Sequence, residues 1–151
     1  MRKFEIVEDF AIKYNEKDIV LPKRATTHSA GYDFYSPTDI TIEAGKSEII
    51  WSNVKAMCNE GEFLLIVVTS GMGKRGLILS NGIGVVDKDY YGNPTTDGNI
   101  GFRITNLGSE PYTFAKGDKI GQGIFMPYYT LDEDNYDDIK RVGGFGSTDN
   151  K

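Results

Sequence analysis

The apolar run Phe63-Leu64-Leu65-Ile66-Val67-Val68 is the strongest strand signal of the chain. A short apolar run bounded by turn residues predicts a β-strand covered on both faces, and we place that strand at residues 62–68. Asn59-Glu60-Gly61 supplies the turn before it. After it, residues 70–74 predict one short helical turn with Ser70 as its N-terminal cap.

Short alternating segments continue this pattern on both sides of the run, and helical periodicity is nearly absent. The other predicted strands span residues 32–35, 40–42, 47–54, 77–79, 99–106, 112–114 and 119–129. Many short strands at spacings near ten residues favour an all-β barrel or sandwich.

The chain of 151 residues, 39% of them hydrophobic, predicts one β domain over residues 1–130. Residues 131–138 are acidic and poor in core residues, which indicates an exposed linker. Residues 141–148 are glycine-rich but carry Arg141 and Phe145. A flexible C-terminal arm that orders over a ligand would use both side chains, whereas a disordered terminus with an incidental aromatic is the alternative.

Composition excludes several classes of protein. The sequence has no apolar run long enough for a membrane span and no secretory signal, so we expect no membrane association. A single cysteine, Cys58, fits a reducing cytoplasm, and one Cys with one His makes a zinc site of N and S ligands untenable. The net charge of −5 argues against broad nucleic-acid binding but permits a small polyanion held with a divalent cation. His28 is expected in an exposed loop, Cys58 in the core, and Trp51 in packing rather than binding.

The segment Asn81-Gly82-Ile83-Gly84-Val85-Val86-Asp87-Lys88-Asp89-Tyr90 predicts a tight β-hairpin, because its glycines tolerate positive φ. Such a loop can approach a planar ligand closely with its main-chain donors and acceptors. An ordinary hairpin with an acidic tip is the alternative.

Five segments, in order, resemble the five motifs of the trimeric deoxyuridine triphosphatases (dUTPases). They are Ala30-Gly31-Tyr32-Asp33-Phe34-Tyr35, Thr69-Ser70-Gly71-Met72-Gly73, segment 81–90, Gly117-Asp118-Lys119-Ile120-Gly121-Gln122 and Arg141-Val142-Gly143-Gly144-Phe145-Gly146-Ser147-Thr148. Each motif alone is weak to moderate, but the ordered set is specific. The stretch Asp89-Tyr90-Tyr91-Gly92-Asn93-Pro94 is similar to versions from Gram-positive bacteria and their phages.

The resemblance implies a jelly-roll-like, distorted β-barrel of the β-clip type, with one short helix and a flexible C-terminal arm. It also implies a homotrimer with active sites at subunit interfaces, in which the arm of one subunit closes over a site built by the others. The implied reaction is Mg²⁺-dependent hydrolysis of dUTP to dUMP and diphosphate in the cytoplasm of the cell, or of the host if the chain is phage-encoded. That reaction limits uracil in DNA and supplies dUMP for dTTP synthesis.

The resemblance also assigns roles to single residues. Asp87 matches the general base that activates the attacking water. The catalytic set is completed by Ser70 and Gln122, which also match phosphate contacts. Asp33 matches a residue that holds Mg²⁺ only through water. Asn81, Gly82 and Val85 match contacts to the uracil, Tyr90 matches the ring under the deoxyribose, and Gly71 matches a phosphate contact. Arg141 and Phe145 match the contact of the arm with the γ-phosphate and its stacking ring over the uracil.

Each role has a structural alternative. Asp87 could cap a turn, Tyr90 could be a core aromatic and Ser70 could cap the helix. Gln122 could be a satisfied strand glutamine, and Asp33 could serve a turn.

The chain departs from the family pattern at three places. Thr69 stands where Arg is usual, which removes a charge near the phosphates unless Lys74 or Arg75 reaches back. The second motif is about one residue short, and the arm has altered spacing with Asp149 in place of a common Gly. Two other functions therefore stay open: a dCTP deaminase of the same fold, and a catalytically weak dUTPase-like protein that acts through a partner.

Overall fold

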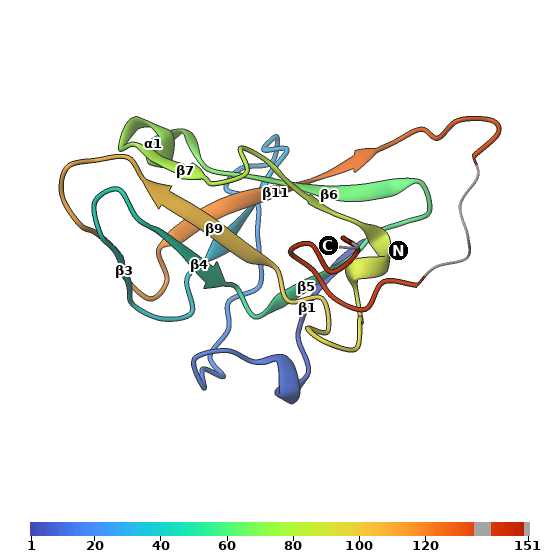
Figure 1. Cartoon of the computed structure of the whole chain (residues 1–151), viewed down its shortest axis with the longest axis horizontal. Coiled ribbons are helices and arrows are strands. Elements are labelled where there is room, and N and C mark those ends of the chain that lie inside the picture. Colours follow the sequence, from blue (N-terminus) through green and yellow to red (C-terminus); the bar gives the residue numbers. More distant parts are fainter. Residues whose placement is uncertain (135–139, 150–151) are drawn as a thin grey trace.

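The computed structural model describes residues 1–134 and 140–149, and it is built almost entirely of short strands (Figure 1). The strands are β1 (Lys3–Ile6), β2 (Tyr32–Tyr35), β3 (Ile40–Ile42), β4 (Ser47–Trp51), β5 (Val54–Met57), β6 (Glu62–Val67), β7 (Leu77–Leu79), β8 (Gly84–Val86), β9 (Gly101–Asn106), β10 (Tyr112–Phe114) and β11 (Lys119–Pro127). One α-helix, α1 (Ser70–Lys74), and two short 3-10 turns, η1 (Asp9–Ala11) and η2 (Lys88–Tyr90), complete the described elements. The predicted all-β class with one short helix is confirmed.

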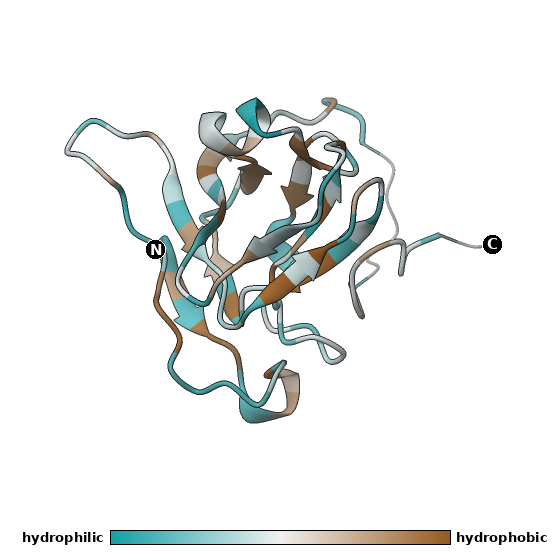
Figure 2. Ribbon diagram, turned by 90° about the vertical axis from the view of Figure 1, so that its left-hand side faces the viewer, coloured by the Kyte–Doolittle hydropathy of each residue, from teal (hydrophilic) through white to brown (hydrophobic). Residues whose placement is uncertain are grey.

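The strands form two main antiparallel layers around one core. The first layer has the order β2-β11-β6-β8 and the second the order β4-β9-β7, with the pairs β1-β5 and β10-β3 at the margins. Hydrophobic segments concentrate in the strands, and hydrophilic segments occupy many of the loops (Figure 2). Alternation explains this core: on β6, Leu64 and Ile66 are buried, while Phe63 and Leu65 point outward and are half-buried.

One predicted strand is in fact two. Residues 47–54 divide into β4 and the start of β5, because Asn53 adopts a left-handed φ of 58° that breaks the extended chain. Asn53 is fully buried, and its side chain is held by Lys13 and Asn99. β1, which pairs with β5, was not predicted from the sequence.

The prediction of a tight β-hairpin over residues 81–90 is wrong. The strands β7 and β8 on either side of the loop do not pair, because β7 joins β9 in one layer and β8 joins β6 in the other. The turn, with Gly82 at a φ of 76°, thus carries the chain from one layer to the next. Gly84 is required where β8 meets β6, since a Cβ there would collide with the Ile66 side chain.

The predicted helical cap is also wrong. Thr69, not Ser70, is the N-cap of α1: its backbone is extended, and its hydroxyl accepts the Met72 N–H at 3.3 Å. Ser70 is therefore the first helical residue, and the cap does not use its hydroxyl.

Two expectations about single residues can be checked in the described part of the chain. His28 is exposed and Cys58 is buried, as predicted. Burial raises the pKa of the Cys58 thiol to about 11, so it stays protonated near neutral pH. Within residues 1–134 and 140–149, no helix has the length and apolar character needed to span a membrane.

Candidate active site

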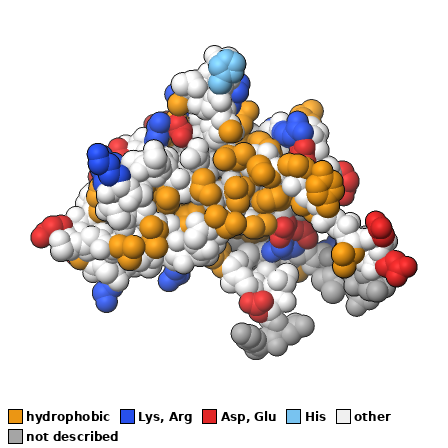
Figure 3. Space-filling model, turned by 90° about the horizontal axis from the view of Figure 1, so that it is seen from above, with side chains coloured by type: hydrophobic (Ala, Val, Ile, Leu, Met, Phe, Trp, Pro, Cys, Tyr) orange, Lys and Arg blue, Asp and Glu red, His pale blue; other side chains and the backbone are white. Residues whose placement is uncertain are grey.

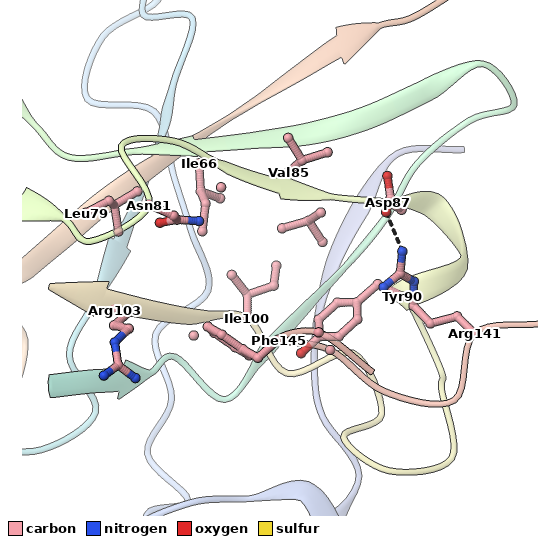
Figure 4. A pocket seen from close by; sticks show the side chains of 15 residues that line it. Ile66, Leu79, Asn81, Val85, Asp87, Tyr90, Ile100, Arg103, Arg141 and Phe145 are labelled. Carbon is pink, nitrogen blue, oxygen red and sulfur yellow. Dashed lines mark hydrogen bonds and ion pairs between the residues drawn. The ribbon is translucent and has the colours of Figure 1, made fainter. Parts of the chain in front are cut away.

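A cavity of about 260 Å³ opens where β7 and β8 part. Figure 4 shows Asn81 and Leu79 at one end of it and Asp87, Tyr90 and Arg141 at the other. Its walls are mainly apolar, and the residues that form them include Ile66, Leu79, Val86, Ile100 and Gly101. Because β7 and β8 do not pair as a hairpin, they separate here and leave this space between them.

The loop 81–85 borders the cavity with main-chain groups. Asn81, Gly84 and Val85 line it, while the Val85 side chain is 58% exposed and points away from it (Figure 4). β8 is the edge strand of the layer β2-β11-β6-β8, so in the described part of the chain one side of its backbone has no strand partner and can face a flat ring in the cavity.

Tyr90 forms the floor at the other end. Its ring is 7% exposed, belongs to the hydrophobic core, and its hydroxyl donates to the Asn99 carbonyl at 2.6 Å. Burial raises the pKa of this phenol, so it remains a neutral donor. Tyr90 therefore belongs to the core and also lines the cavity, so its role as a core aromatic does not exclude a contact with a ligand.

Asp87 lies at the rim, just after β8. It occupies the position before η2, but its side chain makes no capping hydrogen bond, so the turn-cap alternative is wrong. The carboxylate is 48% exposed and pairs with the guanidinium of Arg141. Asp89 binds the same guanidinium through Nε at 2.9 Å. No sequence signal pointed to this contact that Asp87 and Asp89 share.

The C-terminal arm covers the cavity of its own chain. Besides the contact of Arg141, the Thr95 hydroxyl donates to the Val142 carbonyl. Gly144 packs against Tyr90, where a Cβ would lie 2.7 Å from the ring, and Phe145 lines the cavity. Residues of the predicted arm segment therefore line the cavity of their own chain.

A second group of predicted residues gathers at the far end of the first layer. Gln122 on β11 lies opposite Asp33 on one side and Val67 on the other, and the Ser70–Gly71 turn follows shortly after β6. A Cβ at Gly31 would overlap the Gln122 Oε1, so any larger residue there would displace the Gln122 side chain. Asp33 is largely buried and pairs with the Lys119 Nζ at 2.8 Å, and this hydrogen bond raises the pKa of Lys119.

Arg75 lies close to the turn at which Thr69 stands in place of the usual arginine. Its Nη1 donates to the Gly71 carbonyl at 3.4 Å, so the guanidinium lies against the turn that is expected to bind phosphate. Arg75 therefore brings a guanidinium from the end of α1 back to the turn that begins at Ser70.

The two groups of residues are far apart in one chain. Val86, next to Asp87, lies opposite Leu64 near the start of β6, whereas Ser70 follows the end of that strand. At about 3.3 Å per strand residue, the part of β6 from Leu64 to Val67 alone spans about 10 Å, so the two side chains lie toward opposite ends of that strand. No single water or phosphate can touch both.

An all-β chain with a loop-lined cavity for a flat ring, a carboxylate at its rim and a separate hydroxyl-bearing turn defines a nucleotide-binding β-barrel protein. The dUTPase family model matches residues 17–149, and the chain belongs to this family of enzymes, which hydrolyse dUTP. It is 39% identical to the deoxyuridine 5'-triphosphate nucleotidohydrolase of Lactococcus lactis, over 98% of this chain and 97% of that protein. The Fowlpox virus enzyme is 36% identical, over 85% and 88%.

Solved structures agree with this assignment. The dUTPase of Streptococcus mutans superimposes with a TM-score of 0.74 at 35% identity, covering 85% of this chain and 98% of that one. The dUTPase of phage phi11 of S. aureus gives 0.70 at 19% identity, over 92% and 97%, which supports the fold alone. The predicted family and its jelly-roll-like β fold are confirmed.

Proposed function

We propose that this chain hydrolyses dUTP to dUMP and diphosphate by attack of a water on the α-phosphorus, with Asp87 as the general base. The supporting observation is the position of Asp87, whose half-exposed carboxylate stands at the rim of a cavity that fits a flat ring. A carboxylate suits this task because phosphoryl transfer depends on positioning and on stabilising charge. The proposed biological role is to limit uracil in DNA and to supply dUMP in the cytoplasm.

Uracil is proposed to enter between loop 81–85 and the apolar walls. The Asn81 side chain and the backbone of residues 82–85 would pair with the base edge, and Tyr90 would lie under the deoxyribose. Cytosine presents the opposite donor and acceptor at its position 4, which would leave buried backbone groups unpaired. Because Tyr90 is fixed by its bond to the Asn99 carbonyl, it cannot move aside for a ribose hydroxyl.

The phosphate chain is proposed to meet the second group of residues. Because Thr69 caps α1, the Ser70 hydroxyl is available to donate a hydrogen bond to a phosphate oxygen. Gly71 would contribute its N–H group and Gln122 its amide. Arg75 would supply the positive charge at this turn.

Mg²⁺ is proposed as the cofactor. A group of three or more His, Cys, Asp or Glu side chains able to hold a metal was not found in residues 1–134 and 140–149, so an all-protein cage does not fit. A Mg²⁺ held by the triphosphate and its own waters does fit, with Asp33 ordering a water. When bound, the ion neutralises phosphate charge. A phi11 dUTPase variant is described with a structural Mg(II) ion.

A homotrimer is proposed because one chain cannot complete the site. Asp87 and Ser70 lie toward opposite ends of β6, so the Ser70 turn of one copy would meet the cavity of another. The outer face of the layer β2-β11-β6-β8 offers a surface for such contacts. Hydrophobic side chains gather there (Figure 3), among them Phe63, Leu65, Val85 and Met126. Apolar side chains that gather on one face, rather than lying singly, are typical of a protein–protein interface.

A panel of nucleotides tests the reaction. We expect diphosphate release from dUTP with Mg²⁺, and at least hundredfold slower release from dCTP, dTTP and UTP. Each of these three nucleotides would either leave a buried polar group unpaired or collide with a side of the cavity. Diphosphate and ammonia are measured in the same samples. Ammonia from dCTP would identify a deaminase, and absence of diphosphate with excess Mg²⁺ would identify a non-catalytic protein.

Mixed oligomers test whether sites are shared. Asp87→Asn and Ser70→Ala are each expected to be nearly inactive alone. After equal amounts are unfolded together and reassembled, about one quarter of the shared sites should hold both native residues, and activity should recover to about that fraction. Wild type mixed with itself is the control for recovery. If mixing restores no activity, both residues serve the same chain and the shared site is excluded.

A further inference from the structure

Trp51 is fixed beside the cavity by both of its neighbours. It ends β4, opposite Gly101 on β9, where a Cβ would lie 2.9 Å from the indole ring. The Lys13 Nζ lies 5.8 Å from the ring centre, and the Trp51 backbone N–H donates to the Tyr14 hydroxyl at 3.0 Å. Gly101 thus leaves space for the indole, and the N-terminal segment supports it.

The exposed side of this indole meets the arm. The rings of Trp51 and Phe145 are 5.5 Å apart at an interplanar angle of 76°, which is an edge-to-face contact. Phe145 is otherwise 59% exposed and has a φ of 50°. Its neighbour Gly144 packs on Tyr90. Two aromatic rings of the barrel, Tyr90 and Trp51, therefore hold consecutive residues of the arm.

We propose that Trp51 is a positioning residue for dUTP hydrolysis, which holds the Phe145 ring at the mouth of the cavity. Phe145 lines the cavity itself, whereas Trp51 contacts Phe145 from the side of β4. Trp51 therefore acts on the substrate through the arm. This inference rests on the proposed closure of the arm over the base. It gives a function to an aromatic that the sequence indicated only as a packing residue.

Fluorescence tests the contact without any nucleotide. Trp51 is the single tryptophan of the chain, so all indole emission comes from this position. A chain that ends at Lys140 lacks Phe145, and its emission should shift to longer wavelength because the indole gains water contact. The full-length Phe145→Leu variant should shift in the same direction. Identical emission from all three proteins would overturn the contact.

Kinetics test the positioning role through a double-mutant cycle. Trp51→Leu should lower kcat/KM about two- to tenfold, the range expected from one aromatic pair, and Trp51→Phe should restore most of it. In a Phe145→Leu background, Trp51→Leu should have little further effect, since its partner is gone. If the two losses simply multiply, the residues act independently and the proposal fails.

One outcome distinguishes a failure of the Trp51 proposal from a failure of the proposed closure of the arm over the base. If Phe145→Leu leaves kcat/KM unchanged while truncation still shifts the emission, the contact exists but the arm does not act on the base. Thermal unfolding of each variant serves as the control for stability. Because Trp51→Phe keeps an aromatic ring, it tests the role even if Trp51→Leu does not fold.

Discussion

Asp87→Asn is expected to lower kcat for dUTP by about 10²- to 10⁴-fold, the usual contribution of a general base. The amide keeps the shape of the carboxylate but cannot accept the proton of the attacking water. Binding of a non-hydrolysable dUTP analogue should survive, because the cavity walls and loop 81–85 are unchanged. Steady-state rates and calorimetric titration measure the two quantities separately.

The neighbouring carboxylate supplies the matched control. Asp89 binds the same Arg141 guanidinium but is more exposed, with 56% of its side chain accessible against 48% for Asp87. Asp89→Asn removes the same charge and weakens the same ion pair, so it should change kcat only a few-fold. If the two variants lose equal activity, the loss at Asp87 reflects the contact of the arm. A rate within a few-fold of wild type for Asp87→Asn would show that the base is another group.

The free protein already holds Asp87 in an ion pair with the arm. Arg141 was assigned from the family resemblance to the γ-phosphate, yet without nucleotide its guanidinium binds Asp87 and Asp89. A triphosphate would compete with these carboxylates for the same cation. Under the proposed mechanism, Arg141 would exchange these carboxylates for phosphate when the arm closes, and this exchange would free the Asp87 carboxylate for the attacking water.

Sequence reasoning located the strands well because the signal is local. Alternation and turn residues gave β2, β3, β7 and β10 with their observed bounds. Which strands pair with each other could not be predicted from local sequence. The loop between β7 and β8 has the residues of a hairpin turn, although its two strands belong to different layers. The left-handed Asn53 is stabilised by distant groups, Lys13 and Asn99, that no nearby residue signals.

In the candidate site too, some features have a local sequence signal and others depend on the three-dimensional packing. The motif residues were found because their order resembles a family, and the structure places Asn81, Asp87, Tyr90 and Phe145 around one cavity. Chain order alone cannot show that Ser70 lies at the opposite end of β6. The roles of Arg75 and Trp51 depend on where their side chains reach, which is a property of packing.

Removing residues 141–151 is expected to lower kcat/KM by about a hundredfold or more while leaving the barrel folded. The truncated chain loses a charged hydrogen-bond donor, worth about 1.5–3 kcal/mol, and a ring that stacks on a base, worth about 1–3 kcal/mol. The arm adds little to the core, because among residues 140–149 only Gly143 is buried. The midpoint of thermal unfolding should therefore fall by less than about 4 °C.

The full-length double variant Arg141→Ala/Phe145→Leu separates side chains from backbone in this experiment. If the two side chains carry the effect, it should reproduce most of the loss seen on truncation. If the kcat/KM of the double variant stays near the wild-type value while that of the truncated chain is low, the glycine-rich backbone must act by excluding water from the closed site. A fall in the unfolding midpoint well beyond 4 °C on truncation would contradict both readings, because the contacts of the arm with Tyr90, Thr95 and Trp51 would then stabilise the fold rather than the closed complex.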